Sequence, residues 1–545
     1  MKFTLSWLKE HLKTSATVVE IATKLSEIGL EVEHVEDLSL KLKSFVVARI
    51  LEAKKHPNAD RLQVVMVEIE KGQPPVEVVC GAPNARAGLL SVFAPIGTYI
   101  PGSQITLERK PVRGVVSNGM MCSAAELELS EDSEGILELE TSFSDKVGTS
   151  YVEVAGLADP IFDVKLTPNR PDCTGVRGIA RDLAAAGLGT LKHDVRIHGV
   201  EGAFDCPFPV KIELPKEAAH ACSALAFRFI KDVKNSSSPD WLQQRLKAVG
   251  LRPINALVDV TNYISQDRGR PLHVYDADKL KGTIHARLGK SGEKILALDG
   301  KEYCIDSDTC VIADDTGALG IGGIIGGEKS GCTEHTRNVL IECALFDPIR
   351  IASTGRKLNV VTDARYRFER GVDPQSVLYG LDLATQLIEK FCGGKPSKAT
   401  LAGQISSETR TISFNTKLVT KISGIKIETT QIQRTLEALG CTLSGTGEVI
   451  SVSPPTWRPD IHGQADLVEE VVRIEGLNRI PSTPLPRKTG ITPPVMTARQ
   501  KMTRRARHEL AARGFVEAIT WSFISRKDAT AFGGGSDLLE LSNPR

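Results

Sequence analysis

The sequence predicts an α+β protein of several domains. The chain has 545 residues, and a single hydrophobic core rarely grows beyond roughly 250–300 residues, so we expect about three to five units. The spacing of apolar residues changes along the chain from helical to strand-like and back. Stretches rich in proline and glycine separate these regions, as they do at domain boundaries.

Residues 1–38 and 150–200 predict one helical N-terminal domain, interrupted by a barrel. In the first stretch, apolar residues recur near helical spacing and Gly29 is a natural helix stop. Between the two stretches, residues 39–149 contain short strands, in which Val65 and Val67 alternate with Met66 and Glu68. Glycine and proline turns separate these strands, so we expect a small antiparallel β-barrel inserted in the helical domain.

Three further units follow. Residues 205–400 alternate strands with helices and form the largest α+β unit, and residues 402–480 form a smaller α/β unit. A stiff linker then contains Pro481, Pro484, Pro486, Pro493 and Pro494. The last unit, residues 482–545, opens with a basic helix near residue 497. The sequence stops soon after a strand-like segment, so we expect the natural protein to be longer.

The overall charge points to no particular partner. Lys and Arg total 68 and Asp and Glu total 67, so contact with nucleic acid would need local basic patches. The 11 cysteines are scattered and form no Cys-x-x-Cys pair, which argues against a zinc knuckle and a disulfide framework. No apolar run reaches the roughly 20 residues of a membrane span. We therefore expect a cytoplasmic protein.

Three polar segments lie beside predicted barrel strands, at residues 56–62, 79–84 and 117–123. Loops on small barrels commonly hold single-stranded nucleic acid or tRNA through a few polar side chains. For any one residue, such as His56, Asn58 or Asp60, a turn cap is the better explanation. All three segments in order on one barrel favour a nucleic-acid site.

The central unit contains a candidate pocket. His273 can orient or accept a proton near neutral pH, and Glu342 can accept a hydrogen bond from a polar substrate group. Glycines around Gly326 allow a ligand to approach the backbone. No Ser or Cys nucleophile has a triad partner nearby, so a positioned water is the expected attacker. From the residues alone, a satisfied core histidine, a capping glutamate and a glycine turn are the favoured explanation.

Four acidic residues lie in or just before a predicted helix that ends at Gly476. These candidate metal ligands are Asp460, Asp466, Glu469 and Glu470. Their spacing predicts neighbouring turns of one helix face, and oxygen-only ligands favour Mg²⁺ over zinc. The alternative is a solvated acidic face on which Glu469 pairs with Arg473.

Several motifs together resemble one family, the bacterial phenylalanyl-tRNA synthetase beta subunits. They are residues 1–3 (MKF), 6–8 (SWL), 29–33 (GLEVE), 252–255 (RPIN), 258–263 (VDVTNY) and 367–374 (RFERGVDP). The resemblance covers nearly the whole chain. It implies that the barrel is a tRNA-binding OB-fold, and that residues 402–480 are a winged or putative-helix domain. It also implies that residues 482–545 begin a class II synthetase-like module without active-site residues.

The resemblance implies that residues 205–400 are an editing domain, which hydrolyses tyrosine wrongly attached to phenylalanine tRNA. A pocket for phenylalanine rejects a side chain that only adds a hydroxyl by no more than about 100-fold, so a second pocket must select for that hydroxyl. The matching positions that would line it are Thr261, Asn262, Pro271, His273, Gly326, Glu342, Thr362 and Ala364. Glu342 is the candidate that recognises the hydroxyl.

The family also implies partners and a cofactor. These are an alpha subunit, in an assembly of two alpha and two beta subunits, phenylalanine tRNA, and the ATP and phenylalanine bound by the complex. The four carboxylates match Mg²⁺ ligands at the contact with the alpha subunit. Attachment of phenylalanine belongs to the complex.

Two other functions remain open from the sequence. One is a non-catalytic tRNA-binding scaffold or chaperone-like protein. The other is a magnesium-dependent phosphotransferase, because Gly322 and Gly327 are spaced as in a phosphate loop. Glu328 stands where that motif requires lysine, which argues against the second alternative.

Overall fold

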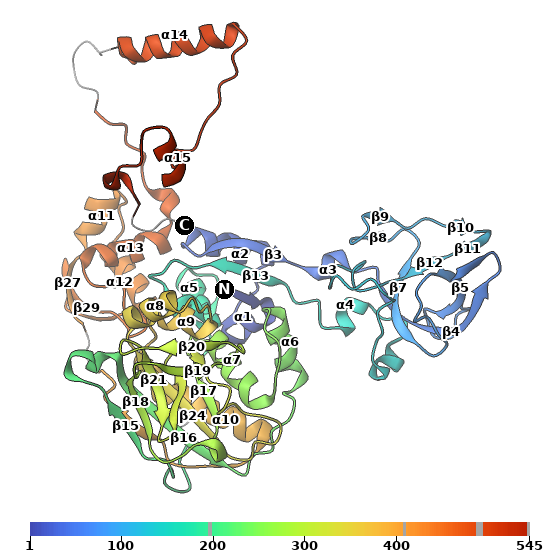
Figure 1. Ribbon diagram of the computed structural model, residues 1–545, viewed down its shortest axis with the longest axis horizontal. Coiled ribbons are helices and arrows are strands. Elements are labelled where there is room, and N and C mark those ends of the chain that lie inside the picture. Colours follow the sequence, from blue (N-terminus) through green and yellow to red (C-terminus); the bar gives the residue numbers. More distant parts are fainter. Residues whose placement is uncertain (194–198, 407–409, 487–493, 542–545) are drawn as a thin grey trace. The chain divides into compact units, whose positions relative to one another are not determined.

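The computed structural model describes residues 1–193, 199–406, 410–486 and 494–541 (Figure 1). The chain divides into two compact units, residues 1–481 and 482–545, and each is described by itself. In the described parts, no helix is both long and apolar enough to cross a bilayer. Helices and strands alternate through the larger unit, as expected of a multidomain α+β protein.

The N-terminal part combines helices with a small sheet. Helix α2 begins at a Thr17 capping box with Glu20, and the chain leaves it at Gly29, whose φ is 88°. The elements are β1 (Lys2–Thr4), α1 (Leu5–His11), β2 (Leu12–Lys13), α2 (Val18–Glu27), β3 (Glu31–Glu36), β13 (Ile161–Lys165), α5 (Val176–Ala185) and β14 (Thr190–Leu191). The stretches predicted to be helical contain these helices but also an antiparallel sheet of β1, β13 and β3, which the prediction did not include.

The inserted region is a five-stranded antiparallel barrel, as the alternating pattern predicted. Its strands, in the order β12-β7-β4-β5-β6, are β4 (Val46–His56), β5 (Ala59–Glu68), β6 (Val76–Cys80), β7 (Leu90–Pro95) and β12 (Gly119–Met121). Next to β12, the Asn118 amide donates to the Glu77 carbonyl of β6 at 3.0 Å, which links the two ends of the sheet. Val65 and Val67 are fully buried in the barrel core.

Smaller elements surround the barrel. They are α3 (Leu38–Lys41), β8 (Tyr99–Ile100), β9 (Ile105–Thr106), β10 (Lys110–Val112), β11 (Val115–Ser117), the 3-10 turn η1 (Thr141–Lys146) and α4 (Tyr151–Val154). Strands β8 and β9 form one hairpin and β10 and β11 form another.

The central unit is built on two sheets, of which the first is antiparallel and the second is mixed. The first has the order β17-β24-β16-β25, with β26 also paired to β16, and contains β16 (Cys222–Lys231), β17 (His273–Asp276), β24 (Val339–Phe346), β25 (Lys395–Pro396) and β26 (Thr400–Gly403). The second has the order β15-β18-β21-β22-β23 and contains β15 (Val210–Glu213), β18 (Ile284–Leu288), β21 (Cys310–Asp314), β22 (Gly317–Ile321) and β23 (Ile325–Gly326). A hairpin, β19 (Glu293–Leu296) and β20 (Glu302–Ile305), accompanies them.

The two faces of the first sheet bury different partners. On one face, Ala226 and Ile341 share a core with residues of the helices. On the other face, Phe227 and Leu340 share a core with the second sheet. Successive residues of a strand point to opposite faces, which explains this division. The helices of the unit are α6 (Asp240–Ala248), α7 (Ala256–Arg268), α8 (Pro348–Lys357), α9 (Asp363–Phe368) and α10 (Ser376–Cys392).

The last part of the larger unit packs three helices on a three-stranded sheet of order β27-β29-β28. Its elements are β27 (Ile412–Asn415), α11 (Lys417–Ser423), α12 (Thr429–Ala438), β28 (Thr442–Ser444), β29 (Val449–Ser453) and α13 (Gln464–Glu475). The predicted stop at Gly476 is confirmed, because its φ of 109° ends α13.

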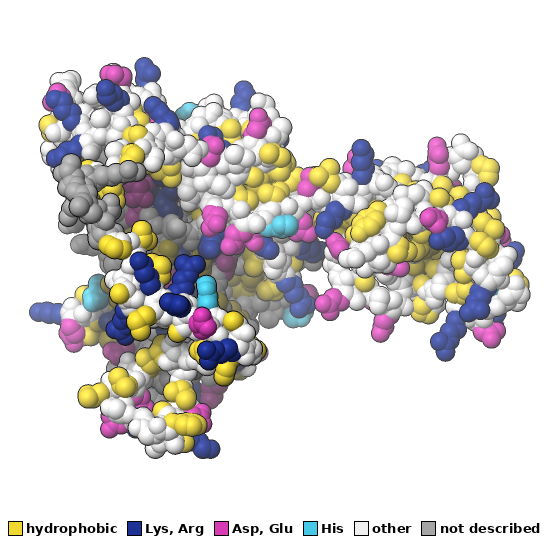
Figure 2. Space-filling model, turned by 90° about the horizontal axis from the view of Figure 1, so that it is seen from above, with side chains coloured by type: hydrophobic (Ala, Val, Ile, Leu, Met, Phe, Trp, Pro, Cys, Tyr) yellow, Lys and Arg dark blue, Asp and Glu magenta, His cyan; other side chains and the backbone are white. Residues whose placement is uncertain are grey.

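The unit of residues 482–545 contains α14 (Ala498–Ala512) and α15 (Arg526–Ala531). The predicted basic helix is confirmed, and a Thr497 capping box with Gln500 starts it. None of its residues is buried, and Lys and Arg side chains gather over this helix (Figure 2). Pro493 of the predicted linker and residues 542–545 lie outside the described residues.

Candidate functional site

A small cavity of about 90 Å³ opens beside the first sheet of the central unit. Its wall is formed by β17, β24, the β22–β23 hairpin and α9. Five of the eight pocket residues that the sequence indicated line it: Pro271, His273, Gly326, Glu342 and Ala364. Residues from four separate elements therefore meet at one place.

Strand pairing brings the two titratable residues together. His273 of β17 and Glu342 of β24 are direct partners in the antiparallel register. Side chains of opposed residues on neighbouring strands point to the same face, about 4.5–5.5 Å apart at Cβ. The pairing therefore places an imidazole next to a carboxylate in the cavity wall.

Glu342 is 7% exposed and holds a hydrogen bond inside the cavity. The hydroxyl of Tyr275 donates to its Oε2 atom. Burial raises the pKa of Glu342 to about 7, while the Tyr275 hydroxyl and the charge of Arg270 oppose that rise. The same burial, together with the Glu342 charge, raises the pKa of Tyr275. Glu342 thus changes its charge near neutral pH while already bound to a phenol.

His273 is held in its neutral form, because burial lowers its pKa to about 4. Its Nε2 atom is buried and has no hydrogen-bond partner among the described residues. The ring packs edge-on against Tyr275, with centroids 4.4 Å apart. A neutral imidazole has one donor and one acceptor nitrogen, so His273 can hold a water or a substrate oxygen.

Gly326 leaves room for the imidazole of His273. A Cβ atom at this position would lie 2.4 Å from Cε1 and 2.7 Å from Nε2 of His273. Such contacts are far inside van der Waals distance, and rigid ring atoms cannot yield cheaply. Glycine is therefore needed for the ring to occupy the cavity wall.

Three predicted residues do not line the cavity. The Thr261 hydroxyl donates to the Val258 carbonyl within α7, at 2.7 Å, and Asn262 lies beside it, half-buried. Thr362 caps α9 and donates to the Ile324 carbonyl at 2.6 Å. Thr362 therefore links α9 to the β22–β23 hairpin, and both of these elements contribute residues to the cavity wall.

Sequence reasoning missed two aromatic residues in the wall, Tyr275 and Phe368. Tyr275 is two residues beyond His273 in β17, so the period of two in a strand puts both side chains on one face. The two-residue period of a strand could therefore have predicted that Tyr275 lies beside His273. Phe368 comes from the end of α9, and nothing in the sequence indicates its position.

Of the three polar segments of the barrel, the first makes hydrogen bonds at turns and the other two line a cavity. His56 Nε2 lies 3.0 Å from the Val112 carbonyl, and the Asn58 side chain donates to the Arg113 carbonyl. The other two segments contribute to one cavity of about 510 Å³, which is lined by Val79 to Pro83 and by Met120, Met121 and Ser123. The Asn58 amide also donates to His56 Nδ1 at 3.0 Å, so His56 both caps its own turn and ties it to the β10–β11 hairpin, whereas the other two segments share a concave surface.

The structure does not bring the four predicted metal ligands together, and this corrects the expectation of one acidic helix face. Glu470 is 3% exposed and receives hydrogen bonds from Arg458 and Arg473. Arg458 also makes a two-bond pair with Asp460. Asp466 accepts the backbone amides of His462 and Gly463 at the start of α13, and Glu469 is exposed. The alternative was also wrong, because Arg473 pairs with Glu470 and not with Glu469.

The carboxylates of this region do not fit a preformed magnesium site. Arginines bind Asp460 and Glu470, so two of the four charges are already neutralised. Among the described residues, the group of three close ligating side chains is Asp172, Cys173 and Asp182. Arg170 forms ion pairs with both acids of that group, at 2.9 and 2.7 Å.

We expect Mg²⁺ to leave the thermal unfolding midpoint of this chain unchanged. A cation that bound only the folded chain at 100 times its dissociation constant would add about 2.7 kcal/mol. Breaking the arginine pairs would cancel much of that gain. Differential scanning fluorimetry with Mg²⁺ and with Na⁺ at equal ionic strength checks this, and a rise of several degrees with Mg²⁺ alone contradicts it.

Four family models match the chain in order. They are the putative tRNA binding domain (residues 45–147), the B3/4 domain (221–393), the tRNA synthetase B5 domain (412–477) and the phenylalanyl tRNA synthetase beta chain CLM domain (480–545). The cavity with His273 and Glu342 lies in the B3/4 match, and the ion pairs of α13 involve the B5 match.

Curated relatives match over the whole chain. Phenylalanine–tRNA ligase beta subunits of Bradyrhizobium diazoefficiens and Rhodopseudomonas palustris are 53% and 54% identical over 544 residues. These matches cover 100% of this chain and 67% of each relative. The motifs that suggested this family are therefore confirmed. The chain belongs to the family of phenylalanine–tRNA ligase beta subunits.

Proposed function

We propose that this chain, as the beta subunit of a phenylalanine–tRNA ligase, hydrolyses tyrosine mischarged onto phenylalanine tRNA. The hydrogen bond between the Tyr275 hydroxyl and Glu342 carries this proposal. This pairing, a phenol that donates to a buried carboxylate, is of the same kind as the one a substrate tyrosine would need. A phenylalanine side chain would leave that carboxylate without the added donor, which disfavours it.

The chemistry proposed for the cavity is hydrolysis of an ester by water. Water attacks the ester carbonyl carbon, the bond to the ribose oxygen breaks, and free tyrosine and a ribose hydroxyl result. The neutral His273 ring supports the water or the substrate oxygen through Nε2, which has no other partner among the described residues. We assign hydroxyl selection to Glu342 and positioning to Thr362 and Gly326. Thr261 and Asn262, which the resemblance also placed at the pocket, lie in α7 outside the cavity wall and receive no role in this proposal.

The other domains are assigned to binding and assembly. We propose that the barrel is an OB-fold that binds tRNA, and that residues 402–480 form a winged or putative-helix domain. Residues 482–545 begin a class II synthetase-like module, whose exposed basic helix α14 contacts phosphate or the alpha subunit. The proposed complex contains two alpha and two beta subunits in the cytoplasm and attaches phenylalanine with ATP.

We propose Mg²⁺ as the cofactor of that ATP-dependent step. Asp460 and Glu470 would first have to leave their arginines to bind it. In the part of the chain that the structure describes, Asp466 and Glu469 form no ion pair, so they are the better candidates of the four.

Deacylation assays test the proposed function. Phenylalanine tRNA charged with tyrosine or with phenylalanine is incubated with this chain co-expressed with an alpha subunit. We expect rapid hydrolysis of the tyrosyl ester and slow hydrolysis of the phenylalanyl ester. Equal slow decay of both esters, with tRNA still bound, would instead support the non-catalytic scaffold.

The preference for the tyrosyl ester should increase as pH rises through about 7. The folded-state pKa of Glu342 is raised, so the carboxyl is neutral below that pH and ionised above it. An ionised acceptor makes a stronger hydrogen bond to a phenol than a neutral acid does. The ratio of tyrosyl to phenylalanyl hydrolysis rates between pH 6 and 8 measures this effect. A flat ratio that still depends on Glu342 would contradict it.

A further inference from the structure

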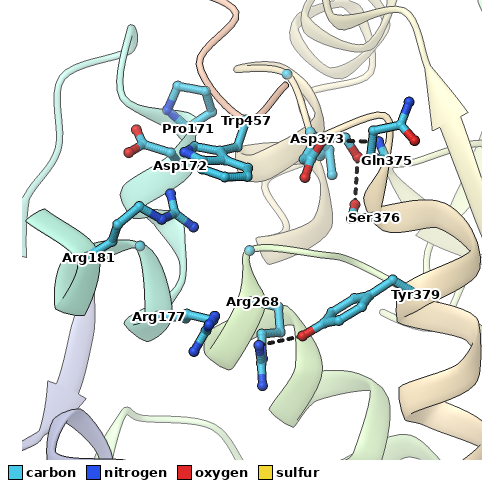
Figure 3. Close-up of a pocket in the computed structure, with 14 residues that line it drawn as sticks. Pro171, Asp172, Arg177, Arg181, Arg268, Asp373, Gln375, Ser376, Tyr379 and Trp457 are labelled. Carbon is cyan, nitrogen blue, oxygen red and sulfur yellow. Dashed lines mark hydrogen bonds between the residues drawn. The ribbon is translucent and has the colours of Figure 1, made fainter. Parts of the chain in front are cut away.

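A second cavity, of about 330 Å³, lies in the larger unit outside the one that contains Glu342. Its wall includes α5, the end of α7, the start of α10 and the loop that carries Trp457. Residues 171–172, 371–373 and 375 also contribute to it. Figure 3 shows Arg177 and Arg181 extending from α5, and Arg268 reaching from α7 to the hydroxyl of Tyr379. Its volume falls at the lower end of small-molecule sites, roughly 300–1,000 Å³.

Two buried hydrogen-bond donors in this wall have no acceptor among the described residues. They are Nη1 of Arg181 and Nε1 of Trp457. The two groups lie together, because the Arg181 guanidinium carbon is 4.1 Å from the centre of the Trp457 ring. Both groups only donate hydrogen bonds. Since buried polar groups normally find partners, a ligand rich in acceptors fits this place.

The charges around the cavity favour an anion. Three arginines and two acids line it, and of the acids Asp172 is paired with Arg170 through two hydrogen bonds, whereas Asp373 accepts the neutral Gln375 amide. Of its arginines, Arg268 is paired with Asp267. Arg181 forms no ion pair among the described residues, and burial lowers its pKa although the charge of Asp172 opposes this. An anion beside this guanidinium would offset the cost of burying its charge.

We propose that this cavity binds a phosphate group of a nucleotide beside Arg181 and Trp457, whose enclosed Nη1 and Nε1 donors turn toward the phosphate oxygens on binding. A planar guanidinium suits phosphate geometry. The cavity extends beyond these two groups to Tyr379, which leaves space for the sugar or base. The ligand is either a free nucleotide or a nucleotide within an RNA strand.

The position of the cavity favours RNA as the source. Gly269 lines this cavity and Pro271 lines the one with Glu342. Two residues of chain span at most about 7 Å, so the two walls adjoin along this segment. Residues 368–371 link the same two cavities a second time, through Phe368 and Gly371. The proposal of a phosphate site does not depend on the proposed hydrolysis. The assignment of that phosphate to the RNA substrate does rest on the proposed hydrolysis.

The test measures binding of three probes to the full chain: inorganic phosphate, AMP and a short single-stranded RNA ending in CCA. Arg181→Gln should weaken binding of AMP and RNA at least tenfold. Trp457→Phe removes one donor but keeps a ring beneath Arg181, and it should weaken binding about threefold or more. Arg434→Gln, the same chemical change at an exposed position of α12, is the matched control and should have no effect.

The salt dependence of RNA binding separates a phosphate contact from a structural effect. Loss of one phosphate contact should lower the slope of log affinity against log salt by about one in Arg181→Gln, and not in Arg434→Gln. If Arg181→Gln fails to fold, Trp457→Phe decides the question. Unchanged binding of all probes by both cavity variants, or no binding by the unsubstituted chain, overturns the proposal.

Competition distinguishes the two sources of phosphate. If the RNA displaces AMP, the site takes a nucleotide of the RNA strand. If AMP binds and the RNA does not displace it, the site takes a free nucleotide. Both results support a phosphate site at Arg181. Glu342→Ala should bind AMP as the unsubstituted chain does. If the hydrolytic function is wrong, AMP binding still depends on Arg181, whereas if the phosphate site is wrong, ester hydrolysis still depends on Glu342.

Discussion

Glu342→Ala should reduce the preference for the tyrosyl over the phenylalanyl ester by about 100-fold. The change removes the buried carboxylate that receives the Tyr275 hydroxyl and, in our proposal, the substrate phenol. A hydrogen bond to a charged group is worth about 1.5–3 kcal/mol, and each 1.4 kcal/mol is a factor of ten. Deacylation rates of both esters, measured under single-turnover conditions, give the preference directly.

Tyr275→Phe is the matched control for this variant. It removes the same internal hydrogen bond but leaves the Glu342 carboxylate in place. Any loss that comes only from that internal bond should therefore appear in both variants. We expect Tyr275→Phe to keep the preference for the tyrosyl ester. Equal loss in both variants would show that Glu342 has a structural role and does not select the hydroxyl.

Glu470→Ala should lower the free energy of unfolding of the 1–481 unit by about 3–5 kcal/mol. Glu470 neutralises Arg458 and Arg473, whose side chains are 3% and 7% exposed. Its removal leaves Arg458 with Asp460 and Arg473 with Asp182, so two buried guanidinium groups each lose part of their charge compensation, at a cost of that size. Arg473 also reaches Asp182 at 2.9 Å, so the loss should loosen the contact between α13 and α5. Urea unfolding monitored by Trp fluorescence measures the change.

Glu469→Ala tests the same idea at the neighbouring position. Its side chain is exposed, so we expect a change within about 0.5 kcal/mol. The two glutamates were equivalent as predicted magnesium ligands, but the structure gives them different surroundings. Equal stability losses, or equal losses of a magnesium-dependent stabilisation, would contradict the ion-pair account.

Local sequence signals predicted the features that depend on neighbouring residues. Thr497 and Gln500 mark the start of α14, and Gly476 marks the end of α13, because caps act within one helical turn. The alternation at Val65 and Val67 predicted buried barrel strands. The strands β1 and β3 went unnoticed because three to six residues with mixed polarity give no clear alternation.

The candidate site was predictable only as far as the family motifs reached. The resemblance implied eight pocket positions, of which five line one cavity, although their role in hydrolysis stays a prediction. Helical spacing placed Glu469 and Glu470 near each other, but it could not show which of them faces the core. That orientation depends on Arg458 and on Asp182 of a distant helix, and sequence spacing does not reveal such long-range partners.

Binding of non-hydrolysable substrate analogues tests the central claim most directly. Tyrosine and phenylalanine are joined by an amide to the 3′ position of adenosine, and their affinities for this chain are compared, with a crystal structure of each complex. The account predicts at least tenfold tighter binding of the tyrosyl analogue, with its phenol hydrogen-bonded to Glu342. Equal affinities, or a tyrosyl side chain bound away from Glu342, would contradict it.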